Sequence, residues 1–74
     1  MPALSNLLTH KVIKAFARDG WILRQGGKHM VLTKPGYPDR LVIPRHRTVK
    51  HGLLLRQIKN AGLTAEAFLK LYNA

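Results

Sequence analysis

Hydrophobic residues recur at helical spacing near the start of the chain. The positions that form this apolar stripe are Leu8, Val12, Ile13 and Phe16. Spacings of three and four residues place them on one face of an amphipathic helix. Thr9 is suited to cap the beginning of this helix, and Gly20 is suited to end it. The pattern therefore predicts a first helix between Thr9 and Gly20, with the seven residues from Met1 as a lead-in.

The spacing of hydrophobic residues then changes to the shorter period that is typical of β-strands. Three short β-prone segments follow, at residues 21–24, 28–33 and 40–43. In the second segment Met30 and Leu32 fall on one face, and His29 and Val31 fall on the other. Turns rich in Gly or Pro separate the segments, at residues 25–27 and 34–39. Three short strands joined by tight turns predict an antiparallel meander.

Helical spacing returns in the last third of the chain. A second helix is expected after Gly52, and its buried stripe is formed by Leu54, Leu55, Ile58 and Ala61. Gly62 is expected to end this helix, and Thr64 to cap a short last helix. Helices on one face of an antiparallel sheet make an α+β two-layer fold, which leaves the other sheet face or its edges open for a ligand. We interpret residues 1–74 as a single domain.

Charge indicates the kind of partner. Thirteen Lys and Arg residues face only three acidic residues, for a formal net charge of +10. Self-repulsion on this scale opposes folding, so a polyanionic partner, nucleic acid above all, is the natural explanation. An anionic membrane fits less well, because the basic residues are spread along the whole chain rather than gathered on one amphipathic helix.

The same composition excludes several other classes. The chain has no Cys, so it has neither a disulfide framework nor Cys-ligated zinc, and it fits a reducing cytoplasm. No apolar run approaches the ~20 residues that a membrane span needs, and the first residues lack the layout of a secretory signal. The His residues lack zinc-ligand spacing, and three acidic residues cannot build a two-metal nuclease. We therefore expect neither a metal nor a cofactor.

Basic residues are most frequent in the predicted sheet and just after it. Candidates for contacting nucleic-acid phosphates are Arg24, Lys28, Lys34, Arg40, Arg45, His46, Arg47 and Lys50. Aromatic residues are few, so stacking on bases is not expected to be the main binding mode. Trp21 is expected in the core, whereas Tyr37 is expected to be exposed at a turn.

His29 is the candidate for chemistry. It follows Gly26, Gly27 and Lys28, and glycines allow a nucleic-acid backbone to come close. Metal-free cleavage of RNA needs a base for the 2′-hydroxyl proton, a cation for the phosphorane and an acid for the leaving oxygen, and His commonly serves as the acid or base. The alternative is that His29 is only a polar residue on a solvated strand face. For His46, phosphate binding is the preferred role and a second catalytic role the minor one.

The order of short motifs resembles that of the HicA (YcfA-like) toxins of bacterial toxin–antitoxin systems. The matching segments are residues 12–16, 19–21, 24–29, 43–46, 52–54, 58–64 and 68–69. The resemblance implies a double-stranded-RNA-binding-domain-like α-β-β-β-α fold, here with a short extra C-terminal helix. It also implies a ribosome-independent mRNA interferase, which is an endoribonuclease, and a HicB antitoxin as partner.

The resemblance also implies that His29 is catalytic. The family's active His lies in a Gly-Ser-His element, which falls here on Gly27, Lys28 and His29. The chain departs from the family in having Lys28 in place of the common Ser and Met30 in place of a common second His. A hydroxyl is lost and a cation is gained, and the cation can itself stabilise phosphate or transition-state charge.

Two other functions stay open on the sequence. The first is a non-catalytic RNA-binding module that acts by occupying RNA, which differs from the nuclease in giving no cleavage products. The second is a DNA-binding subunit. DNA binding is the weaker alternative because a recognition helix needs polar base-reading residues, whereas Leu53, Leu54 and Leu55 make the second helix look like part of the core.

Overall fold

The computed structural model describes residues 4 and 6–74, which form three helices and two small sheets. In chain order the elements are β1 (Leu7–Leu8), α1 (Thr9–Arg18), β2 (Ile22–Gly26), β3 (His29–Thr33), β4 (Leu41–Pro44), β5 (Thr48–Val49), α2 (His51–Asn60) and α3 (Ala65–Tyr72). The predicted order of helix, three strands, helix and short helix is confirmed. The fold is α+β and has the predicted double-stranded-RNA-binding-domain-like form with an extra C-terminal helix.

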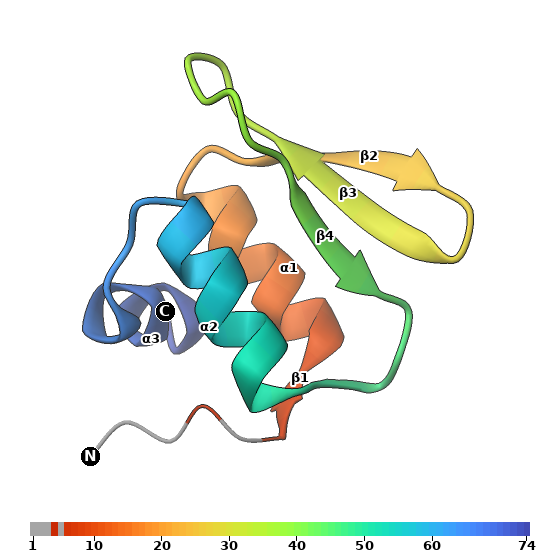
Figure 1. Cartoon of the computed structure of the whole chain (residues 1–74). Coiled ribbons are helices and arrows are strands. Elements are labelled where there is room, and N and C mark those ends of the chain that lie inside the picture. Colours follow the sequence, from red (N-terminus) through yellow and green to blue (C-terminus); the bar gives the residue numbers. More distant parts are fainter. Residues whose placement is uncertain (1–3, 5) are drawn as a thin grey trace.

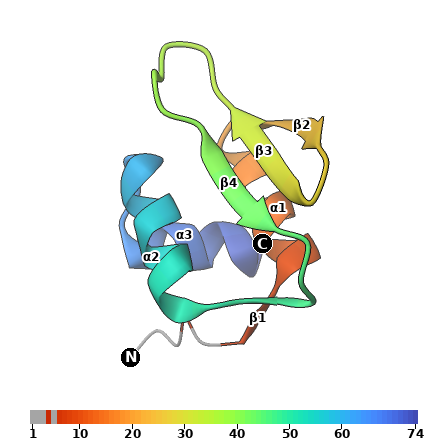
Figure 2. The same ribbon diagram turned by 45° about the vertical axis from the view of Figure 1, so that its right-hand side comes forward.

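The main sheet has the order β2-β3-β4 and is antiparallel throughout. All three helices lie on one side of it, and the opposite face is uncovered in both views (Figures 1 and 2). On β3 the side chain of Leu32 is buried, whereas that of His29 is exposed. The predicted faces of this strand are therefore confirmed, and His29 belongs to the open side of the sheet.

The core lies between the sheet and the helices. Its largest fully buried side chains are Phe16, Phe68, Leu32, Leu41, Ile43, Leu54 and Val12. The rings of Phe16 and Phe68 approach to 4.9 Å between centroids and join α1 to α3. Trp21 is buried, as predicted. Leu4 is also part of the core, so the prediction that all of the first seven residues are a lead-in is wrong at this position.

Glycines end both longer helices, as predicted. Gly20 has a φ of +98° and Gly62 a φ of +75°, in the left-handed region that favours Gly. After α1, the amide of Gly20 donates to the carbonyl of Ala17, and that of Trp21 donates to the carbonyl of Phe16. This pair of hydrogen bonds satisfies carbonyls that the end of the helix leaves without partners. It also turns the chain sharply into the sheet.

The start of α1 differs from the prediction. Thr9 is the first residue of the helix rather than its cap, and Leu8 occupies the cap position without a side-chain hydrogen bond. The hydroxyl of Thr9 instead donates to the backbone carbonyl of His46. Beside it, β1 pairs with β5, with Leu7 opposite Val49. These two strands were not predicted from the sequence, because two residues are too few to show a period.

The buried stripe of α2 also differs at one position. Leu54, Ile58 and Ala61 are buried as predicted, but Leu55 is 40% exposed. Gln57 is buried instead, and its side-chain oxygen accepts a hydrogen bond of 3.1 Å from the backbone amide of Val42 in β4. A polar residue is stable in this core because it satisfies a strand amide.

Replacing Gln57 with Leu is expected to destabilise the protein by about 1–3 kcal/mol, because the amide of Val42 then loses its partner inside the protein. Urea unfolding followed by circular dichroism measures this loss. Arg56→Leu is the matched control, because it places the same new side chain at an exposed position of α2. A Leu variant as stable as the wild type would show that the hydrogen bond contributes nothing.

Among the helices that the structure describes, none combines the length and the apolar character needed to cross a bilayer.

Candidate active site

The turn between β2 and β3 presents His29. Gly26 pairs with His29, so Gly27 and Lys28 form a two-residue hairpin loop. The sequence analysis placed this turn at residues 25–27, and the strand in fact continues through Gly26. Gly27 has a φ of +40°, a value that favours Gly at the first position of such a loop. The loop is exposed, and so is the side chain of His29 at the first position of β3.

The segment that leaves β4 is held against this hairpin loop. Pro44 lies opposite His29 in the sheet. The amide of the next residue, Arg45, donates to the carbonyl of Lys28 over 3.3 Å. The Nε atom of Arg45 donates to the carbonyl of Gly27 over 3.0 Å. These two hydrogen bonds place the guanidinium group of Arg45 beside the loop that carries Lys28.

The other side of this segment is held by α1. The hydroxyl of Thr9 donates to the carbonyl of His46. The amide of Thr9 donates to the carbonyl of Arg47 over 2.9 Å. The segment of residues 45–47 is thus hydrogen-bonded both to the β2–β3 loop and to the start of α1. Sequence reasoning missed the role of Thr9, because nothing near it in the chain signals a contact with residues so distant.

These contacts bring residues from two parts of the chain to one surface depression, which we call the His29 depression. It is lined by Gly27, Lys28, His29, Pro44, Arg45 and His46. Two other depressions adjoin it, because His46 also lines both of them; one includes Arg47 and the other includes Lys50. Among the described residues, no Asp or Glu lines any of the three. The depressions therefore form a basic, solvent-open surface suited to phosphate groups.

Three of the predicted phosphate-binding residues lie elsewhere. Arg24 is on β2, and its Nε donates to the hydroxyl of Thr33 over 3.4 Å. Lys34 and Arg40 flank the loop between β3 and β4. Lys34 follows His29 by five residues, so it lies about 16 Å away along the strand. Arg40 precedes Leu41, which pairs with Leu32, so it also lies near the far end of β3. The structure therefore does not gather them with the His29 depression.

Lys34 also has a structural role. Its ammonium lies 3.3 Å from a carboxylate oxygen of Asp19. It also lies 4.8 Å from the ring centroid of Tyr37, which is partly exposed, as the sequence predicted. The ring of Tyr37 in turn lies 5.4 Å from that of Trp21. These contacts hold the β3–β4 loop against the end of α1, so Lys34 has partners without any ligand.

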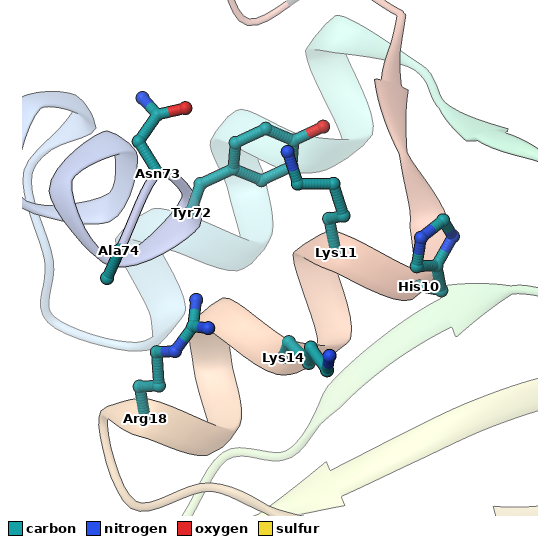
Figure 3. Close-up of a pocket in the computed structure, with 7 residues that line it drawn as sticks. All are labelled: His10, Lys11, Lys14, Arg18, Tyr72, Asn73 and Ala74. Carbon is teal, nitrogen blue, oxygen red and sulfur yellow. The ribbon is translucent and has the colours of Figure 1, made fainter.

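A separate basic surface lies along α1 and the end of α3 (Figure 3). It is lined by His10, Lys11, Lys14, Arg18, Tyr72, Asn73 and Ala74. Arg18 donates to the carbonyl of Leu71 over 2.6 Å, and the ammonium of Lys11 lies 4.4 Å from the ring centroid of Tyr72. A cation at the carbonyl end of a helix is favourable. We therefore interpret the basic residues of this surface as contacts that hold α3 against α1.

Within residues 4 and 6–74, no three His, Asp or Glu side chains are grouped closely enough to hold a metal ion.

Comparison with known proteins assigns most of the chain to one family. The model of a family described as the HicA toxin of bacterial toxin–antitoxin systems matches residues 9–63. The matched range contains both segments that line the His29 depression and Thr9, which holds one of them. No curated protein matches the chain.

Proposed function

The chain belongs to the HicA toxin family, and from this premise we propose that it is an endoribonuclease that cleaves mRNA without a metal ion. Its catalytic residue is His29, acting as a general acid or base. The observation that carries this proposal is the composition of the His29 depression. An exposed imidazole stands there beside Lys28 and Arg45, and no carboxylate of the described residues lines the surface. An mRNA substrate also implies that the protein acts in the cytoplasm.

The proposed reaction uses the 2′-hydroxyl of the RNA as the nucleophile. Its oxygen attacks the adjacent phosphorus, the bond from phosphorus to the 5′-oxygen breaks, and the products end in a 2′,3′-cyclic phosphate and a 5′-hydroxyl. His29 transfers one of the two protons involved. Lys28 and Arg45 stabilise the charge that develops on the phosphorane oxygens. Lys28 thus has a direct role at the position where the family commonly has Ser.

A wider basic surface binds the rest of the RNA in this proposal. Arg47 and Lys50 follow the His29 depression along the chain and line the depressions that adjoin it, and His46 lines all three. They hold phosphates without selecting bases. Arg24 on β2 and the more distant Lys34 and Arg40 do not line the depression, and they are proposed to contact RNA that extends across the sheet.

HicA toxins pair with an antitoxin, and we propose that the partner of this chain is a HicB-like protein. An acidic surface on that protein would complement the His29 depression, which no carboxylate of the described chain lines. Opposite charges would also speed association at low ionic strength. Occupation of the depression would exclude RNA phosphates and so neutralise the toxin.

Cleavage of a defined RNA by the purified protein tests the proposed function. We expect the same cleavage rate with and without EDTA, together with 2′,3′-cyclic phosphate and 5′-hydroxyl ends. Replacing the 2′-hydroxyl by hydrogen at the cleaved nucleotide is expected to abolish cleavage at that bond, because the nucleophile is lost. RNA that is bound in a salt-dependent manner but never cut would instead identify a non-catalytic RNA-binding module.

A further inference from the structure

We propose that His46 is a second catalytic residue and forms an acid–base pair with His29. This inference rests on the proposed function. Cleavage through the 2′-hydroxyl requires two proton transfers, one from the nucleophile and one to the leaving oxygen. The fold places a second imidazole at the same depression, and it comes from a different part of the chain.

The positions of the two His residues are defined by the sheet. His29 lies opposite Pro44, and His46 follows Pro44 by two residues. Antiparallel partners have Cα atoms about 5 Å apart, and two residues span at most about 7 Å. The Cα atoms of His29 and His46 are therefore held within about 13 Å of each other. Both side chains line the same depression, with Lys28 and Arg45 beside them.

The backbone of His46 is held while its imidazole is left available. Its carbonyl accepts the hydroxyl of Thr9, and the amide of the preceding Arg45 is bonded to the carbonyl of Lys28. The side chain of His46 is exposed. Among the hydrogen bonds that the structure gives for the described residues, none involves the imidazole of His46 or that of His29. The backbone of this segment is thus held by hydrogen bonds that do not involve the imidazole of His46.

The paired reaction balances with no other reactant. The neutral imidazole takes the proton of the 2′-hydroxyl as the bond from the 2′-oxygen to phosphorus forms. The protonated imidazole donates its proton to the 5′-oxygen as the bond from phosphorus to that oxygen breaks. The two imidazoles end with exchanged protonation states, and water restores them. Lys28 and Arg45 stabilise the phosphorane between the two transfers.

His46→Gln tests this assignment, with His51→Gln as the matched control. His51 is also exposed, but it lies in the first turn of α2 and does not line the His29 depression. We expect His46→Gln to lower kcat by on the order of 100-fold or more. The Kd for RNA is expected to rise only a few-fold, because Lys28, Arg45, Arg47 and Lys50 still bind phosphates, and the melting temperature is expected to stay close to that of the wild type. The control is expected to keep the wild-type kcat.

A modified substrate separates proton donation from other roles. In this RNA, sulfur replaces the 5′-oxygen at the bond that the wild type cuts, and a thiolate leaves without being protonated. We expect this substrate to restore cleavage to one of the variants His29→Gln and His46→Gln, and not to the other. The rescued variant is the one that has lost the general acid.

The outcomes separate this inference from the proposed function. A wild-type protein that does not cut RNA overturns the proposed function. If the wild type cuts and only His29→Gln is impaired, His46 is not catalytic. A His46→Gln variant whose loss appears only in Kd or KM identifies a phosphate-binding residue and overturns the pair. Rescue of both variants, or of neither, overturns it as well.

Discussion

Replacing His29 with Gln is expected to lower the rate of RNA cleavage by on the order of 10²–10⁴-fold, the usual contribution of a general acid or base. Growth arrest on expression is expected to disappear with it. The side chain is exposed at the first position of β3, so its replacement leaves the core intact. Gel analysis of RNA cleavage and growth after induction measure the two effects.

His51→Gln again serves as the control for this change, since it alters an exposed imidazole outside the depression. The variant proteins are compared at equal concentration and with their folding checked by circular dichroism. Should His29→Gln cleave RNA and arrest growth as the wild type does, His29 has no part in the chemistry. If the wild type and the His29→Gln variant both arrest growth but neither cleaves RNA, the protein acts by binding RNA and not by cutting it.

Replacing Phe16 with Ala is expected to lower the free energy of unfolding by about 3–5 kcal/mol. Phe16 is fully buried, and its ring packs against that of Phe68 in α3. A chain of 74 residues has a total stability of roughly 4–11 kcal/mol. The loss is therefore a large fraction of the total and is expected to leave the variant partly unfolded. Urea unfolding followed by circular dichroism measures it.

Leu55→Ala is the contrasting variant. The sequence analysis placed Leu55 in the buried stripe of α2, but the side chain is 40% exposed. Because the side chain already meets solvent, we expect a loss well below that of Phe16→Ala, on the order of 1 kcal/mol or less. Equal losses for the two variants would contradict the packing described for α2.

The residues around His29 divide according to what holds them. Lys28 and Arg45 are positioned by hydrogen bonds between the β2–β3 loop and the segment after β4, and the backbone of His46 is held by the hydroxyl of Thr9. Lys34 has its own carboxylate and aromatic partners at the other end of the sheet. All of the phosphate-binding roles stay predictions, but the residues proposed for them in the His29 depression share one surface. The cations of greatest interest for catalysis are therefore Lys28 and Arg45.

The order of the main elements was determined by the sequence itself, because it depends on local patterns. A period of 3.6 or 2 residues marks the faces of α1 and β3, and Gly20 and Gly62 end their helices through backbone conformations that few other residues adopt. His29 was also found in this way, from the Gly-rich turn before it and from the family resemblance. These signals lie within a few residues of the positions that they predict.

Only the tertiary structure decided which residues join His29. The hydroxyl of Thr9 contacts the carbonyl of His46 across 37 positions of the chain, and Gln57 is buried because it reaches a strand amide 15 positions away. The strands β1 and β5 form only when both segments are brought together, since each has two residues. Such hydrogen bonds depend on where the sheet and helices pack, and packing has no short-range pattern. For that reason the sequence favoured one catalytic His and gave His46 a phosphate-binding role, and only the fold showed that the two line the same depression.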